Sequence, residues 1–190
     1  MVDVPGEVRV FPAGDAVLTW GREPWATVWD AATGRAVCEL VGHASPITDA
    51  EIFPDGGRVI TGSLDHTAVI WNVAACAARQ RLTHSSWLTG VAVLGRGDRV
   101  ATTNSKGWKT VWTVSSGDRL QRLYEPPPLR MQPAIGVKGF PQDERVLTFN
   151  LQEAAIWDGA SGKMRLRLLR VPRRLGGVVV APGGDVVAAC

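Results

Sequence analysis

The chain has 190 residues, of which 45% are hydrophobic and 21% charged, and its formal net charge is +3. Its longest apolar runs, such as residues 176–182, are too short to span a bilayer, and its N-terminus lacks the basic start and apolar core of a secretory signal. These features predict neither a transmembrane segment nor a secretory signal. We therefore expect an intracellular protein, in the cytoplasm in preference to the nucleus.

Cysteines and histidines are few and widely spaced. The three cysteines form no CxxC pair and are Cys38, Cys76 and Cys190. The three histidines have no metal-ligand spacing and are His43, His66 and His84. This usage predicts neither a disulfide framework nor a zinc site, and it favours a reducing compartment. We expect no metal and no cofactor.

A pattern repeats along the chain with a spacing of 41 to 46 residues. The residues that precede the first turn of each unit are Phe11, Phe53, Leu94, Phe140 and Ala181. A valine follows six residues later in all five units, and a threonine follows eight residues later in four of them. The tryptophans that come next are Trp29, Trp71, Trp112 and Trp157. A period in this range predicts an array of structural repeats.

The most regular unit contains three runs that favour strands. Residues 47–53 and 58–61 are rich in β-branched side chains, and the Pro-Asp-Gly-Gly turn between them predicts a hairpin. The apolar run at residues 67–71 then predicts a third strand that is packed on both faces. One such sheet is only marginally stable alone.

Residues 42–72 resemble one repeat of the WD-repeat (Trp-Asp repeat) β-propeller family. The resemblance rests on Gly42-His43, the turns at 53–56 and 62–65, and Trp71-Asn72, where the family usually has Trp-Asp. In this family each blade is a four-stranded sheet whose strands are lettered a to d from the central channel outward. The resemblance covers nearly the whole chain.

The resemblance implies an all-β fold, a partial propeller of about four and a half four-stranded blades that forms an open arc and not a closed ring. The expected blades, within a single segment 1–190, are 7–41, 47–83, 88–124, 135–169 and an incomplete fifth at 177–190. Because both ends interrupt a repeat, we expect a fragment of a larger protein. An open arc leaves unpaired strand edges through which copies could associate.

The resemblance also implies a hydrogen-bonded tetrad in the second blade, made of His43, Thr61, Asp65 and Trp71. Ser63 lies on the same strand face as Thr61 and is the alternative hydroxyl. A histidine, a hydroxyl and a carboxylate also occur together in catalytic triads. We favour a structural role, because a connected chain of donors and acceptors satisfies buried polar groups. The third blade has Lys106 at the position of Asp65.

In this family the b–c and d–a loops form one rim of the propeller. The chain places on this rim residues of the kinds that often dominate interface energies, namely Trp20, Arg22, Trp25, Trp87, Lys106 and Trp108. We expect them to bind a partner. The alternative for Trp25 and Trp108 is packing between blades, because each shares a strand face with the tryptophan four residues later.

Basic residues concentrate toward the C-terminus. Residues 1–60 carry four basic and nine acidic side chains, a net charge of −5, whereas residues 61–190 carry seventeen and nine, a net charge of +8. The densest run contains Lys163, Arg165, Arg167, Arg170, Arg173 and Arg174. In a strand, its first three basic residues share one face, and Met164, Leu166 and Leu168 form the opposite, buried face. The run suits an acidic partner, namely RNA, an anionic membrane surface or an acidic peptide. The alternative, which we favour, is that its charges protect an edge strand from aggregation.

No catalytic signature is visible, and residues 159–163 lack the spacing of a phosphate loop. We therefore predict a non-catalytic scaffold that binds other proteins or peptides, not an enzyme. One alternative is a propeller that binds RNA or an anionic surface through its basic C-terminal half. Another is the sensor domain of a larger multidomain enzyme.

Overall fold

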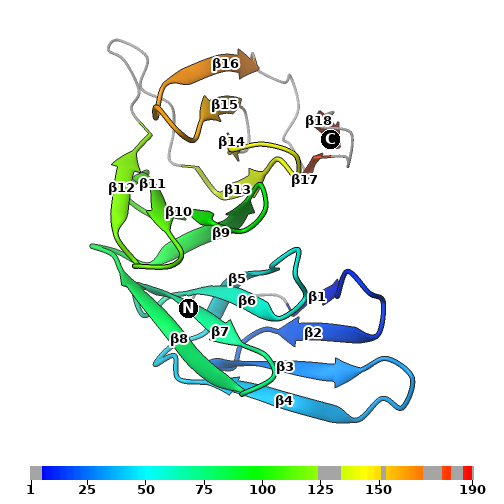
Figure 1. The fold of residues 1–190 in the computed structure, drawn as a ribbon. Helices are drawn as coiled ribbons and strands as arrows, with labels where there is room; N and C mark the ends of the chain where they lie inside the picture. The colour runs from blue at the N-terminus through cyan, green and yellow to red at the C-terminus, as the bar shows by residue number, and fades with distance from the viewer. Residues whose placement is uncertain (1–5, 124–133, 151–152, 169–176, 181–185, 190) are drawn as a thin grey trace. The chain divides into compact units, whose positions relative to one another are not determined.

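Figure 1 shows the computed structural model of the chain. The structure describes residues 6–123, 134–150, 153–168, 177–180 and 186–189. In these ranges all regular secondary structure is β-strand, and the strands form four antiparallel four-stranded sheets and one pair. The predicted all-β fold of four-stranded sheets is therefore confirmed. The chain divides into two compact units, Met1–Leu88 and Thr89–Cys190.

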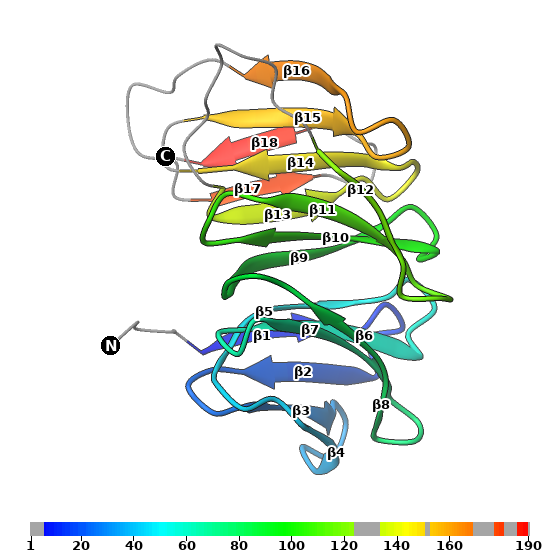
Figure 2. The ribbon, with the colours of Figure 1, turned by 90° about the vertical axis from the view of Figure 1, so that its left-hand side faces the viewer.

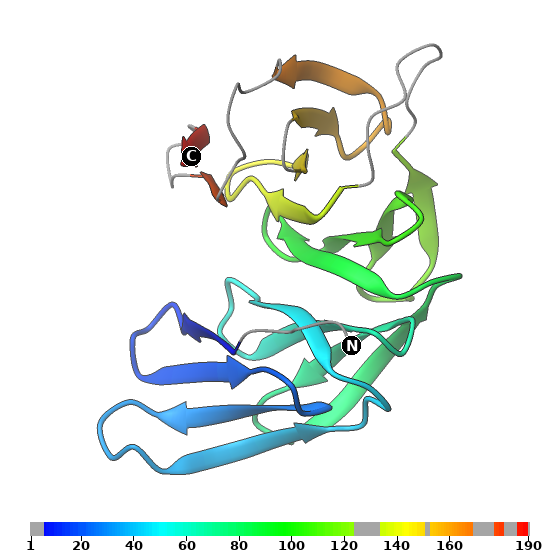
Figure 3. The same ribbon diagram turned by 180° about the vertical axis from the view of Figure 1, so that it is seen from behind.

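The first unit contains two sheets in which each strand pairs with the next along the chain. The first sheet has the order β1 (Glu7–Val10), β2 (Ala16–Trp20), β3 (Trp25–Asp30) and β4 (Ala36–Val41). The second has the order β5 (Ile47–Ile52), β6 (Arg58–Ser63), β7 (Thr67–Asn72) and β8 (Ala77–Thr83). The strands of the first sheet run in sequence from dark to light blue in Figure 3.

A glycine in the left-handed region closes the first turn of each sheet in the first unit. Gly14 has a φ of 75° and Gly56 a φ of 66°. The Gly14 amide donates to the Phe11 carbonyl and the Gly56 amide to the Phe53 carbonyl, both at 2.9 Å. A side chain would be strained at these φ values, which explains the glycine three residues after the apolar marker in the first three repeats, where the fourth repeat has Asp143.

The two sheets of the first unit share one core. Its buried members include Leu18, Val28 and Leu40 from the first sheet, and Val59 and Trp71 from the second. Each of these side chains is at most 2% exposed. Since one sheet alone has little apolar surface to bury, this shared core is what stabilises both blades.

A disulfide joins the two sheets of the first unit, and this contradicts the sequence-based expectation. Cys38 on β4 is bonded to Cys76 in the turn between β7 and β8, with Cα atoms 5.6 Å apart. The two cysteines are 38 residues apart in sequence, and only the packing of one blade on the next brings them together. The cysteine pattern therefore no longer supports a reducing compartment.

The second unit repeats the same sheet design (Figure 2). One sheet contains β9 (Leu88–Leu94), β10 (Arg99–Asn104), β11 (Lys109–Thr113) and β12 (Arg119–Arg122). The next contains β13 (Gly136–Gly139), β14 (Arg145–Phe149), β15 (Ala154–Asp158) and β16 (Met164–Leu168). A two-stranded sheet pairs β17 (Gly177–Val180) with β18 (Val186–Ala189).

The sheets of the second unit pack closely on one another. Leu94 and Val111 from one sheet share a buried cluster with Val146 and Trp157 from the next. At Gly139 the backbones approach so closely that a Cβ atom would lie 1.9 Å from the carbonyl oxygen of Val93. Only glycine fits there, so the close approach of β13 to β9 depends on this residue.

Candidate functional site

A continuous chain of hydrogen bonds runs through the second sheet. The Trp71 indole N–H donates to the Thr61 hydroxyl oxygen at 2.8 Å. The Thr61 hydroxyl lies 2.7 Å from His43 Nε2, and His43 Nδ1 lies 2.8 Å from an Asp65 carboxylate oxygen. Every donor has an acceptor when the proton of His43 is on Nδ1. The structure thus brings these four residues together, while Ser63 bonds instead to the carbonyls of residues 45 and 46.

Burial and hydrogen bonding set the charges of this network. Burial lowers the pKa of His43, although Asp65 acts in the opposite direction. Burial also raises the pKa of Asp65, but hydrogen bonds from the Ala44 amide, the Thr67 hydroxyl and His43 outweigh it and hold that pKa at about 2. The network therefore holds a neutral imidazole next to an ionised carboxylate at neutral pH.

Unlike the nucleophile of a catalytic triad, the hydroxyl of this network cannot be reached by a substrate. Thr61 is completely buried, and its hydroxyl accepts from Trp71 while it donates to His43. His43 is 7% exposed. A substrate carbonyl would have to reach the hydroxyl oxygen within about 3 Å, which the surrounding side chains prevent.

The tryptophan-to-threonine bond recurs in the other three sheets. It joins Trp29 to Thr19 at 2.8 Å, Trp112 to Thr102 at 2.9 Å, and Trp157 to Thr148 at 2.7 Å. In all four sheets a register shift toward the fourth strand stands immediately before the tryptophan. Such an irregularity re-aims a side chain, and here it coincides with the residue that bonds the threonine.

Asparagines that the sequence analysis did not single out hold the second turns of the third and fourth sheets. The Asn104 side-chain oxygen accepts from the amides of Lys106 and Trp108 at 3.1 and 3.0 Å. The Asn150 oxygen accepts from the Glu153 amide at 2.9 Å. The available signal was the recurrence of asparagine two residues after the strand threonine, a residue type that favours such turns.

The predicted rim residues of the first unit differ in exposure. Trp20 is 4% exposed and belongs to the core, so its prediction as a binding residue is wrong. It ends β2 on the same face as Leu18, which is also buried, and this alternation was readable in the sequence. Trp25 is 37% exposed and Trp87 is 45% exposed, and Arg22 is exposed as well.

In the second unit, Trp108 is 46% exposed and stands immediately before β11. The guanidinium carbon of Arg122 on β12 lies 4.1 Å from the centre of its indole ring, a cation–π geometry. Lys106, two residues earlier, is exposed. The stacked arginine holds the indole as a platform, and Arg122 was not among the predicted site residues.

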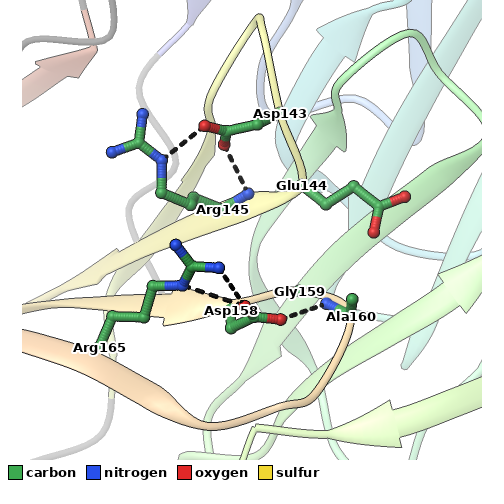
Figure 4. Close-up of a pocket in the computed structure, with 7 residues that line it drawn as sticks. All are labelled: Asp143, Glu144, Arg145, Asp158, Gly159, Ala160 and Arg165. Carbon is green, nitrogen blue, oxygen red and sulfur yellow. Dashed lines mark hydrogen bonds and ion pairs between the residues drawn. The ribbon is translucent and has the colours of Figure 1, made fainter.

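A polar cavity of about 290 Å³ lies in the second unit, at the turn between β13 and β14 and the turn after β15. Figure 4 shows that each arginine lining it is paired with its own carboxylate. Arg145 Nε is 2.7 Å from Asp143, and Arg165 binds Asp158. The pairs leave little unbalanced charge for a ligand. No group of three or more potential metal ligands occurs in the described ranges.

A comparison with protein families matches one of the repeats. The family model described as "WD domain, G-beta repeat" matches residues 34–72, which contain the hydrogen-bonded network from His43 to Trp71. Residues 34–72 therefore form a WD repeat. The match begins in the turn before β4 and ends at Asn72, the last residue of β7.

Three curated relatives illustrate what this chain is similar to. It is 26% identical to "Periodic tryptophan protein 2 homolog" of Neurospora crassa, over 59% of this chain and 13% of that protein. It is 34% identical to "Pre-mRNA-processing factor 19" of Oryza sativa subsp. japonica, over 33% of this chain and 12% of that protein. It is 24% identical to "Guanine nucleotide-binding protein subunit beta" of Nicotiana plumbaginifolia, over 80% of this chain and 43% of that protein. The chain thus spans less than half of each relative's length.

Two of the three described basic residues of the predicted basic run form ion pairs. Arg165 pairs with Asp158 and lowers the pKa of that carboxyl to about 2, and Arg167 lies 2.7 Å from Glu153. Lys163 is exposed. Leu166 is 50% exposed, so the predicted buried face of this strand is wrong at that position, because β16 is the edge of its sheet. Arg170, Arg173 and Arg174 lie outside the described residues, as does the side chain of Leu168.

The described part of the chain contains no helix with the length and apolar character needed to cross a membrane.

Proposed function

We propose that this WD-repeat protein is a non-catalytic scaffold that binds other proteins or peptides. The observation that carries the proposal is the exposed Trp108, held by the guanidinium of Arg122 at the end of a rigid sheet. An indole exposed over almost half of its surface has apolar area to bury on binding, and its stacked geometry costs little entropy to order. Tryptophan and arginine are also the residues that most often dominate interface energy.

The buried network supports the scaffold role and not catalysis. We propose that the chain from Trp71 through Thr61 and His43 to Asp65 is structural, since it connects β6 and β7 with the loop before β5. Such a fully satisfied network stabilises one arrangement of the loops. A rigid sheet with fixed loops is what a binding surface needs.

The names of the relatives are compatible with this proposal. The beta subunit of a guanine nucleotide-binding protein is, by its name, one component of an assembly. The pre-mRNA-processing factor raises RNA as the second candidate. Against RNA stand the ion pairs of Arg165 and Arg167, which remove two of the free charges that phosphate binding would use.

Affinity capture with tryptophan variants tests the proposal. The full chain is immobilised, and partners retained from a lysate are quantified for wild type, Trp87→Ala and Trp108→Ala. If either tryptophan anchors a partner, retention of that partner should fall at least about tenfold, which corresponds to a loss of about 1.4 kcal/mol or more. Leu166→Ala is the matched control, because Leu166 is similarly exposed, at 50%, but lies on the edge strand β16.

Two outcomes would contradict the scaffold proposal. One is undiminished retention of every partner by both tryptophan variants, with unchanged thermal melts. The other is retention that consists of RNA and falls steeply between low and moderate salt, because release of counterions marks phosphate binding. That result would favour the RNA alternative.

A further inference from the structure

We propose that a groove between the two sheets of the first unit binds a basic peptide segment of a partner protein, with one arginine or lysine side chain inserted into it. The groove has a volume of about 350 Å³, enough for one or two side chains. It opens beside the first turns of both sheets, near Ala13 and Gly56. This is the end of the strands opposite to the loops that carry Trp25 and Trp87.

The walls of the groove are apolar. Phe11 and Val28, which are 5% and 2% exposed, form its inner part, and Ala16 and Val73 add partly buried surface. Val37 on β4 is 60% exposed and leaves the groove open to solvent on that side. The methylene chain of a lysine or arginine would cover this surface while its charged end stays near water. Burial of those methylenes supplies the apolar part of the binding energy.

Three carboxylates surround the apolar surface, and no lysine or arginine is among the described residues that line it. Asp15 has no hydrogen-bond or ion-pair partner for its carboxylate in the described part of the chain. Asp30 uses one oxygen, Oδ1, for the Ala32 and Thr33 amides and the Thr33 hydroxyl. Its second oxygen remains available to a cation.

The third carboxylate, Asp55, is already compensated by one arginine. Its Oδ2 lies 2.7 Å from Arg58 Nε, and its Oδ1 accepts from the Gly57 amide at 3.0 Å. Three acidic groups against one nearby guanidinium leave the groove with an excess of negative charge. A guanidinium or ammonium group from a partner complements that excess.

The charge of the whole unit acts in the same direction. Residues 1–88 contain six basic and ten acidic side chains, a net charge of −4. The resulting field attracts cationic segments and repels nucleic acid and anionic membrane surfaces. Charge complementarity therefore selects a basic peptide as the occupant of this groove.

The disulfide fixes the outer walls of the groove. Cys38 follows the wall residue Val37, and the Cys76 amide donates to the carbonyl of the wall residue Val73 at 3.2 Å. The covalent link between Cys38 and Cys76 therefore limits the separation of β4, which carries Val37, from the turn after β7, which carries Val73. A groove whose walls are held in place loses less entropy when a peptide binds.

Fluorescence anisotropy on the full chain tests the groove. The probe is a fluorescein-labelled nonapeptide of alternating arginine and alanine, and the comparison peptide has glutamine in place of each arginine. The arginine peptide should bind wild type, whereas the glutamine peptide should bind at least about tenfold more weakly. Asp15→Asn should weaken the arginine peptide several-fold. Val37→Arg should abolish its binding, because it places a cation at the open side of the groove.

Matched variants decide whether binding occurs in this groove. Asp118→Asn removes an exposed acidic residue from the second unit and should leave the affinity unchanged. Equal weakening by Asp118→Asn and Asp15→Asn, or tight binding by Val37→Arg, would overturn the proposal, because binding would then follow net charge alone. Dimerisation of wild type that Val37→Arg abolishes, without peptide binding, would also overturn it and assign the groove to a second copy.

The groove does not depend on the proposed tryptophan surface, and the two can fail separately. Trp108→Ala should leave binding of the arginine peptide unchanged. Loss of partner capture by Trp108→Ala alone supports only the tryptophan surface, whereas loss of peptide binding by Val37→Arg alone supports only the groove.

Discussion

The Thr61 hydroxyl on β6 bonds side chains from two other segments, β7 and the loop before β5. Trp71 lies ten residues after it and His43 eighteen residues before it, yet both bond to the same oxygen atom. The low dielectric around a completely buried hydroxyl strengthens these bonds and makes any unpaired group expensive. Small changes at these residues should therefore have large effects on stability.

Trp71→Ala should destabilise the folded chain by about 3 to 5 kcal/mol. The side chain is 1% exposed, so its removal leaves a large cavity, and the Thr61 hydroxyl loses the indole N–H that donates to it. Chemical denaturation of the full chain measures the change. Trp108→Ala is the control and should cost much less, since its indole is 46% exposed. A loss below about 1 kcal/mol for Trp71→Ala would contradict the burial of this residue.

His84 should make stability depend on pH in the mildly acidic range. Burial lowers its pKa from 6.5 to about 4. Between these values the unfolded chain takes up the proton and the folded chain does not, so stability is fully present above about pH 6.5 and is lost as pH falls toward 4. The loss from this residue should reach about 3 kcal/mol. His43, whose pKa burial also lowers, contributes in the same direction.

Urea denaturation between pH 4 and 7 measures this dependence. His84→Gln should reduce the pH slope of the free energy of unfolding. His66→Asn is the control for replacing a histidine, because His66 is exposed and asparagine tolerates the φ of 70° found there. An unchanged slope in His84→Gln would show that another group carries the titration. Asp65 loses its contribution only at lower pH, between 3.8 and about 2.

At the scale of the strands, the local sequence pattern predicts the strands well but says little about how neighbouring sheets pack. Alternation and turn residues placed the strands of the second sheet, because both depend on neighbours along the chain. The partner of Cys38 lies in the next sheet, so its position depends on how two sheets pack. The contact of Arg122 with Trp108 lies within one sheet and depends on the register of β12 against β11.

Removal of the disulfide should lower the stability of the first unit by about 2 to 4 kcal/mol, since the bond closes a loop between residues 38 positions apart. Cys76→Ser should reproduce the effect of a reducing agent in a denaturant titration. Cys190→Ser, which keeps both cysteines of the disulfide, is the control. Thiol titration of the denatured, unreduced chain should find one free thiol among the three cysteines. Three free thiols would contradict the disulfide.

For the molecule as a whole, the repeat pattern predicted the fold class because it depends on residues that every sheet needs. The threonine and the tryptophan that bond to each other recur in all four sheets, from Thr19 with Trp29 to Thr148 with Trp157. The surface was less predictable. Trp20 and Trp25 have the same residue type and lie close in sequence, but the first is buried and the second is 37% exposed. The difference follows from which face of the sheet each side chain occupies. The prediction that residues 1–190 form a single propeller segment with the expected blade bounds stays a prediction.

Each four-stranded sheet contains one tryptophan that bonds to the strand threonine. This tryptophan is an intrinsic fluorophore, so each sheet can be followed by its own fluorescence. Indoles that are buried emit at shorter wavelengths than indoles in water, and Trp71 and Trp157 are at most 1% exposed, whereas Trp87 and Trp108 are almost half exposed. Variants that keep one of the repeated tryptophans and replace the rest with phenylalanine would report the opening of a single sheet as a red shift. The chain thus contains an internal optical label for each of its four complete sheets, so the order in which they open can be recorded without attached dyes.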